Sequence, residues 1–277
     1  MTAERVAPLT PAGERMLQEV AAVARAYRRN RFMPLPPSER NFAGDGDFRA
    51  IGAEFLSYFV RLGGLYPRAK VLEIGCGIGR MALPLTQYLT GGAYDGVDVV
   101  RDGVEWCGRS ITPAYGNFHF RHLDYRNPVY NPDGTLKPGT ALPFGAASFD
   151  FVIMTSVVTH LDEVATRFYA AEVARLLRPG GRAFLSLFLM TDAARAGCKA
   201  GASRFAFDPE APGPAFEAEP DRPGHAVAFD EAWLMDLFAG HGLRRLRPVA
   251  YGAWSGRDSR HYQDLCVLEK HQQESVP

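Results

Sequence analysis

The sequence lacks the features that would assign it to several specialised classes of protein. Its four cysteines are widely scattered and form no CxxC or cysteine–histidine spacing, so neither a disulfide framework nor a metal site is indicated. Lysine plus arginine and aspartate plus glutamate both number 31, whereas a protein that reads a nucleic-acid backbone would be basic. No apolar stretch approaches the length of a membrane span, and no signal-peptide pattern opens the chain. We therefore expect a soluble, cytoplasmic protein with no nucleic-acid or membrane partner and no metal.

The chain is long enough to bury a sizeable core. Hydrophobic residues make up 47% of the 277 residues, which suits one enlarged α/β domain. We predict four consecutive parts, which are an N-terminal helical cap segment (1–66), a nucleoside-binding core (67–190), an inserted lid or cap (191–228), and a C-terminal helix with strands that complete the core (229–277).

Two helices are predicted in the first part. After a disordered-looking start, Thr10-Pro11 is typical of a helix start, and apolar residues then recur at helical spacing. A glycine/aspartate turn over Asn41–Phe48 opens a second helix, which ends at Gly63-Gly64. A basic run over residues 25–31 lies at the end of the first helix. The simpler interpretation is a solvated helix end, and the alternative is a phosphate site.

From Lys70 onward, strand and helix patterns alternate. Short apolar runs predict strands at Val71–Ile74, Tyr94–Val99, Phe118–Leu123, Phe149–Thr155, Arg182–Leu189, Leu246–Tyr251 and Gln263–Leu268. Amphipathic patterns predict helices near Arg80–Leu89, Asp102–Ile111, Glu163–Leu177 and Glu231–Ala239. This alternation indicates an α/β fold with a Rossmann-like, mostly parallel sheet of seven strands and helices on both faces.

Two stretches interrupt the alternation. Asn127–Pro143 contains a strong turn signal and predicts a hairpin-like excursion. Thr191–Ala228 is rich in alanine, glycine and proline with little periodicity, which is typical of a lid or a small cap.

A glycine-rich turn is the most informative motif. Val71–Arg80 reads as a buried strand that runs into Gly75, Gly77 and Gly79, a spacing that differs from the GxGxxG of dinucleotide enzymes. Asp98 ends the second strand, where a carboxylate can accept two hydrogen bonds from a ribose diol. The motif pair predicts a nucleoside site without defining which nucleoside binds.

Five motifs in this order resemble the class I S-adenosylmethionine-dependent methyltransferases, and among them the bacterial type 11 branch that methylates small molecules. The matching segments are Glu73–Gly79, Asp98, Leu123-Asp124, Phe149–Thr155 and Leu177–Gly181. The resemblance implies S-adenosylmethionine as cofactor, with S-adenosylhomocysteine as product. It places at the cofactor the residues Glu73, Gly75, Cys76, Gly77, Arg80, Asp98, Val99, Asp124, Tyr125 and Thr155.

Several of these residues have an alternative interpretation. Glu73 either attracts the ammonium group of the cofactor or braces the loop, and Asp98 either binds the ribose or is an exposed acid at a strand end. Unpaired N–H groups of a helix start near Gly79-Arg80 are expected to face an anion. Cys76 is not expected to act as a nucleophile, because methyl transfer needs no covalent enzyme intermediate.

The reaction itself needs proximity and, for an oxygen acceptor, removal of a proton. His160 follows the fourth strand and is our candidate base, with a capping or core histidine as the alternative. Polar residues of the later segments indicate where an acceptor lies, although each alone is more simply structural. They are Asp192, His225, Tyr251, Arg257, Asp258, His261 and Tyr262.

The predicted function is methyl transfer to an oxygen or nitrogen of a small metabolite or sugar-derived compound, by a monomer or homodimer. One alternative is an NAD(P)-dependent oxidoreductase, which the glycine spacing and the lack of a Tyr-x-x-x-Lys pair disfavour. Another is a methyltransferase that modifies macromolecules, or a silent nucleoside-binding module. Neutral charge and the lack of a basic patch interleaved with aromatics disfavour an RNA target.

Overall fold

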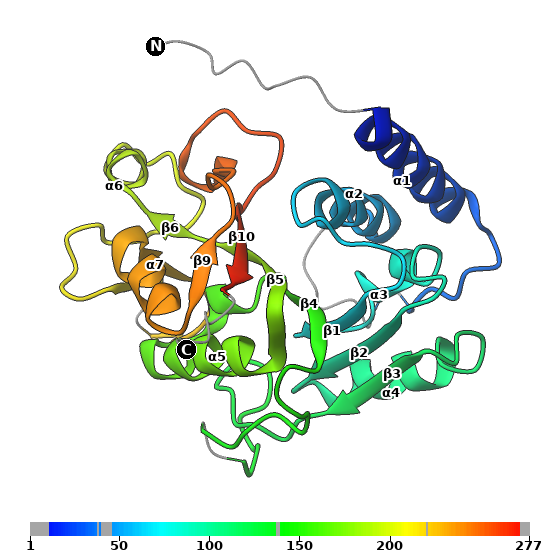
Figure 1. Ribbon diagram of the computed structural model, residues 1–277. Helices are drawn as coiled ribbons and strands as arrows, with labels where there is room; N and C mark the ends of the chain where they lie inside the picture. Colours follow the sequence, from blue (N-terminus) through cyan, green and yellow to red (C-terminus); the bar gives the residue numbers. More distant parts are fainter. Residues whose placement is uncertain (1–10, 38, 40–45, 137–138, 220, 272–277) are drawn as a thin grey trace, which may run out of the picture.

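A seven-stranded sheet organises the protein. The computed structural model describes residues 11–37, 39, 46–136, 139–219 and 221–271. The strand order is β3-β2-β1-β4-β5-β10-β9, and of the strands that these residues form in the sheet, only β10 runs antiparallel to its neighbours (Figure 1). The bounds are β1 Lys70–Ile74, β2 Ala93–Asp98, β3 Phe118–His122, β4 Phe149–Met154, β5 Leu177–Leu187, β9 Leu243–Arg245 and β10 Asp264–Lys270. The predicted fold class is confirmed.

Helices cover both faces of this sheet because its strands bury alternate side chains in opposite directions. On β1, Val71 packs into the core beneath one face, and Leu72 packs into the core beneath the other. The first core includes α1 (Pro11–Arg29), α2 (Phe48–Arg61), α3 (Ala82–Leu85) and α4 (Arg101–Ser110). The second includes α5 (Glu163–Leu176) and α7 (Glu231–Gly240), which lie on the opposite side in Figure 1.

Aspartate side chains fix where three of these helices begin. Asp47 accepts the N–H of Ala50 at the start of α2, as predicted from the turn that precedes it. The start of α5 is capped by Asp162 and that of α7 by Asp230. Each carboxylate satisfies a backbone donor that the helix itself leaves unpaired. The predicted cap Thr10, the N-terminal start and most of the Asn41–Phe48 turn lie outside the described residues.

The segment after residue 190 has more regular structure than its composition indicates. It contributes α6 (Asp192–Lys199), β7 (Ala215–Glu217) and β8 (Val227–Asp230), and β6 (Leu189–Met190) joins the two strands in a second sheet of order β6-β8-β7. Phe188, Phe207, Phe216 and Trp254 centre a small core of its own. We call α6, β6–β8 and their connecting loops the cap. The division of the chain into four parts stays a prediction.

Other boundaries correct the sequence predictions. The helix expected over Arg80–Leu89 is reduced to the four residues of α3, which contains Pro84, a residue without a backbone donor. The prediction of a strand over Leu246–Tyr251 is wrong. The observed strand β9 lies earlier in the chain, and Pro248 interrupts the predicted apolar run. Strand β5 begins at Leu177 rather than at Arg182.

The excursion over Asn127–Pro143 forms no strand among its described residues. Asn127 and Asn131 instead pair through backbone hydrogen bonds of 2.9 and 3.0 Å, which make a tight turn.

Candidate active site

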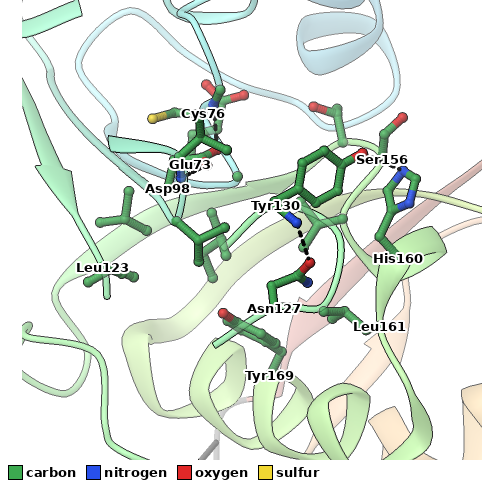
Figure 2. A pocket seen from close by; sticks show the side chains of 18 of the residues that line it. Glu73, Cys76, Asp98, Leu123, Asn127, Tyr130, Ser156, His160, Leu161 and Tyr169 are labelled. Carbon is green, nitrogen blue, oxygen red and sulfur yellow. Dashed lines mark hydrogen bonds between the residues drawn. The ribbon is translucent and has the colours of Figure 1, made fainter. Parts of the chain in front are cut away.

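A cavity of about 340 Å³ lies at the carboxyl ends of the parallel strands β1 to β4, where open α/β sheets bind ligands. Figure 2 shows its side chains converging from the loops that follow these strands and from α5. Those from the core are Glu73, Ile74, Gly75, Cys76, Gly77, Arg80, Met81, Val97, Asp98, Val99, Val100, Leu123, Asn127, Tyr130, Thr155, Ser156, Val157, His160, Leu161 and Tyr169. Phe205 and His225 of the cap complete the lining.

The glycine loop brings backbone to the wall of the cavity. Gly75, Gly77 and Gly79 all have positive φ, between 54° and 80°, which residues with a Cβ rarely adopt. At Gly75 a Cβ would lie 2.3 Å from the Cγ2 atom of Val157, so only glycine fits between the loops after β1 and β4. No helix starts at Gly79-Arg80, because α3 is short and starts at Ala82. The predicted anion site at the unpaired N–H groups of a helix start is therefore not formed there.

Glu73 is buried beside this loop, and Arg80 is partly buried. The hydroxyl of Tyr94 donates to the Oε2 atom of Glu73, and burial raises the pKa of Glu73 to about 8. Both observations favour bracing of the loop over attraction of an ammonium group. Burial also lowers the pKa of Arg80, and its buried Nε has no hydrogen-bond partner in the part of the chain that the structure describes. A guanidinium donor left in this state is suited to an anionic group of a ligand.

Asp98 ends β2 and holds the glycine loop. Its Oδ2 accepts the N–H of Gly77 at 2.6 Å, and its Oδ1 accepts the N–H of Val100 at 2.8 Å. Burial raises its pKa, while these backbone donors lower it. A carboxylate has about four acceptor positions, so Asp98 keeps free capacity for a ribose diol. With 8% of its surface exposed, Asp98 is not the exposed strand-end acid of the alternative interpretation.

Asp124 and Tyr125, expected at the cofactor, do not line the cavity. The carboxylate of Asp124 accepts hydrogen bonds from Thr135 and Asn131, and the hydroxyl of Tyr125 donates to the carbonyl of Thr140. Their polar groups thus brace the loop that follows β3. Leu123, one position earlier, is the residue of this strand end that reaches the cavity.

His160 lies in the 3-10 helix η2 (Val158–His160) and faces the cavity opposite the glycine loop (Figure 2). Its Nδ1 lies 2.9 Å from the carbonyl oxygen of Gly224, an atom that only accepts, so Nδ1 carries the proton. Nε2 is then an acceptor, 3.4 Å from the hydroxyl of Tyr130. Burial lowers the pKa of His160, which keeps the imidazole neutral near pH 7.

Other polar residues predicted near an acceptor are divided among different places. His225 lines the cavity, with Nδ1 2.9 Å from Oε1 of Glu219. Asp192, Tyr251 and Arg257 gather instead at a second hollow of about 380 Å³ between α6 and α7, where the guanidinium lies 4.2 Å from the centre of the tyrosine ring. Asp258, His261 and Tyr262 line neither hollow.

Sequence reasoning missed several lining residues, of which Tyr130 is the most informative. The side-chain Oδ1 of Asn127 accepts the N–H groups of Val129 and Tyr130, both at 2.9 Å, and this Asx turn aims the tyrosine ring into the cavity (Figure 2). The spacing Asn127-x-x-Tyr130 was the available signal. Asn127, Ser156 and Tyr169 were also missed.

Among the described residues, no helix is long and apolar enough to cross a membrane, and no group of three or more His, Cys, Asp or Glu side chains could hold a metal ion.

Comparison with known proteins agrees with this geometry. Residues 71–181 match a family model described as a methyltransferase domain. A phthiotriol/phenolphthiotriol dimycocerosates methyltransferase of Mycobacterium ulcerans is 34% identical over 112 residues, which are 40% of this chain and 35% of that protein. The fatty-acid O-methyltransferase of Mycolicibacterium smegmatis is 32% identical over 126 residues, 45% of this chain and 37% of that protein. The chain thus spans about a third of the length of these curated relatives.

Solved structures share the fold over most of the chain. The magnesium protoporphyrin IX methyltransferase of Synechocystis, solved with S-adenosylhomocysteine bound, superposes with a TM-score of 0.52 at 20% identity, covering 90% of this chain and 99% of that one.

Residues 71–181 thus belong to a methyltransferase domain, and the sheet around them has the fold of the class I S-adenosylmethionine-dependent methyltransferases. The class I resemblance inferred from the five motifs is confirmed, as is S-adenosylmethionine as the cofactor of this class.

Proposed function

We propose that the protein transfers a methyl group from S-adenosylmethionine to an oxygen atom of a small molecule by in-line displacement. The observation that carries the proposal is the cavity at the ends of β1 and β2, where the glycine loop, Arg80 and Asp98 meet. The name of one relative above, a fatty-acid O-methyltransferase, supports an oxygen acceptor. We further propose a small-molecule partner rather than a nucleic acid, a cytoplasmic location, and a monomer or homodimer.

The residues present fit this cofactor. The unpaired Nε of Arg80 suits the carboxylate of the methionine end, and the remaining acceptor capacity of Asp98 suits the ribose hydroxyls. Glycine at position 75 lets the side chain of Val157 pack closely against the glycine loop. When bound, S-adenosylmethionine supplies an electrophilic methyl group on its sulfonium.

The protein then has to hold the acceptor oxygen in line with the methyl group and to remove its proton. His160 is placed for the second task, because its Nδ1–H is fixed by the carbonyl of Gly224 and its unprotonated Nε2 faces the cavity. Its lowered pKa keeps that nitrogen free of a proton at neutral pH.

Calorimetric titration with S-adenosylhomocysteine, beside NAD and NADP, tests the cofactor. We expect micromolar binding of S-adenosylhomocysteine, roughly −8 kcal/mol. Asp98→Asn should weaken it by about 1.5–3 kcal/mol, because the charge-assisted bonds to the ribose are lost. Asp95→Asn on the same strand is the matched control, since Asp95 does not line the cavity. Dinucleotide binding without S-adenosylhomocysteine binding would make the protein an oxidoreductase instead.

A further inference from the structure

The acceptor end of the cavity differs from the cofactor end in the kind of polar groups that it presents. Glu73, Arg80 and Asp98 lie at the glycine loop, whereas the opposite wall presents Tyr130 and His160 with neighbouring aromatic rings. The rings of Tyr130 and His160 meet edge to face, with centroids 5.3 Å apart and planes at 88°. Figure 2 shows the tyrosine ring reaching from its loop across the space between Asp98 and His160.

We propose that Tyr130 is a catalytic residue that relays a proton from the acceptor to His160, and that the acceptor is a neutral aromatic hydroxyl compound. This inference rests on the proposed function and adds the acceptor class and a second proton-handling residue to it.

The relay follows from the way in which the nitrogen atoms of His160 are occupied. Nδ1–H donates to the Gly224 carbonyl, so Nε2 alone can receive a proton, and the group that faces Nε2 is the hydroxyl of Tyr130. The distance of 3.4 Å is long, but hydrogen bonds between catalytic groups commonly tighten when substrate binds. An acceptor in the cavity therefore reaches Nε2 through the tyrosine oxygen.

The proton and electron balance closes with groups already named. The acceptor oxygen forms its new bond to the methyl carbon while the S–CH₃ bond breaks and leaves its electron pair on sulfur. The hydroxyl proton of the acceptor passes to Oη of Tyr130, whose own proton moves to Nε2 of His160, and the imidazolium later releases it to water. Burial raises the pKa of Tyr130, with Asp98 adding to the effect, so a tyrosinate is disfavoured and the proton has to continue to His160.

The charges along the cavity favour a neutral acceptor over a carboxylic acid. Among the described residues that line it, Arg80 at the glycine loop is the only lysine or arginine, and the acceptor end has none. A carboxylate placed there would lose its hydration without gaining a paired cation. It would also be ionised near neutral pH, so that a proton relay would serve no purpose.

The shape of the same wall favours an aromatic acceptor. Tyr169 from α5 and Leu161 supply apolar surface from the core, and Phe205 supplies it from the cap. The rings of Phe205 and His225 meet edge to face, with centroids 6.2 Å apart, so the cap side is also built from rings. An aromatic ligand can add to this packing, because aromatic rings prefer edge-to-face or offset neighbours.

Binding to the protein saturated with S-adenosylhomocysteine tests the acceptor class without turnover. The probes are 2-naphthol and 2-naphthoic acid, which share a ring system and differ in the hydroxyl against the carboxylate. We expect naphthol to bind at least about tenfold more tightly, and Tyr130→Phe to weaken naphthol while leaving naphthoate unchanged. Naphthoate binding as tightly as naphthol, or binding of neither, would overturn the proposed class. S-adenosylhomocysteine binding in the same titration separates this outcome from failure of the proposed function.

Methyl transfer to 2-naphthol tests the relay. Near pH 7, Tyr130→Phe and His160→Gln should each lower turnover by about 10²-fold, whereas Tyr66→Phe, a half-exposed tyrosine outside the cavity, should not. As the pH rises past the pKa of naphthol itself, the acceptor needs no base, and the deficit of Tyr130→Phe should shrink. A deficit that stays constant with pH, no deficit, or no transfer by the wild-type protein would refute the relay.

Discussion

At the scale of single residues, burial decides the protonation of the polar groups in the cavity. It raises the pKa of Glu73 and of Asp98 and lowers that of His160, so each group is pushed towards its neutral form. Asp98 alone among these three has backbone N–H donors aimed at both carboxylate oxygens, which oppose the shift. That difference suits Asp98 to charge-assisted binding and His160 to proton transfer.

The reactivity of two cysteines tests directly whether burial decides the protonation of side chains at the cavity. Cys76 lies between two glycines of the loop, and burial raises its pKa well above the ordinary value, with the charge of Asp98 adding to the effect. Cys198 on α6 is half-buried, and its pKa is raised less. Since the thiolate is the reactive form, limited iodoacetamide should modify Cys198 and spare Cys76, as peptide mass mapping would measure. Faster labelling of Cys76 would indicate an activated thiolate in the loop.

At the scale of elements, apolar runs predicted most of the sheet, because a parallel strand that is buried on both faces carries apolar side chains on both faces. β1, β2, β3, β4 and β10 lie within one or two residues of their predicted bounds. β9 was missed, since two of its three residues are exposed arginines on an edge strand and give no apolar run. The cap was underpredicted for a similar reason, because its strands are only two to four residues long.

The candidate site was predictable where one strand end carries its own motif, as at Gly75 and Asp98. It was not predictable where a loop decides which side chain turns inward. The sequence indicated Asp124 for the cavity, yet the neighbouring turn uses that carboxylate and presents Tyr130 instead. Hydrogen bonds between residues that are distant in sequence, such as Gly224 with His160, leave no local pattern to detect.

The cap loop that carries Gly224 provides a test at this scale. Gly224 has φ +78°, its N–H donates to Glu217, and an added Cβ would lie 3.2 Å from the carbonyl oxygen of His160. Gly224→Ala should therefore lose about 1–2 kcal/mol of folding stability and shift the carbonyl that fixes His160. We expect a lower melting temperature together with lower turnover and unchanged S-adenosylhomocysteine affinity.

Gly201→Ala is the matched control for this change. Gly201 also lies in the cap with φ +70°, but nothing lies within 4 Å of an added Cβ. It should lower the melting temperature similarly and leave turnover intact. Equal turnover in both variants would mean that the Gly224 carbonyl does not position His160.

At the scale of the whole molecule, the cavity joins parts of the chain that lie far apart in sequence. The core on one face of the sheet includes Tyr94, whose hydroxyl donates to Glu73 on β1, just before the glycine loop. The cap, with its own core, closes the acceptor end through Phe205 and His225. A buried ionisable group that lines this cavity therefore affects the stability of the entire fold as well as binding.

Glu73 should make that coupling visible as a dependence of stability on pH. Its pKa is about 8 in the folded protein and 4.5 in an ordinary setting, so between these values the folded state keeps a proton that the unfolded state has lost. The free energy of unfolding should thus fall as the pH rises from about 4.5 to about 8, and the stabilisation from this proton is fully present only below that window. Glu73→Gln, which stays neutral, should remove this part of the slope.

Urea unfolding without ligand, at about pH 5 and about pH 8, measures the effect as the difference between wild type and variant. Ionisable groups other than Glu73 contribute equally to both proteins and cancel in that difference. Glu105→Gln on the exposed side of α4 controls for the loss of a glutamate and should keep the wild-type slope. If Glu73→Gln kept it as well, the carboxyl would have to be ionised in the fold at neutral pH. Tyr94 and Arg80 would then outweigh burial, and the ammonium-binding role of Glu73 would return.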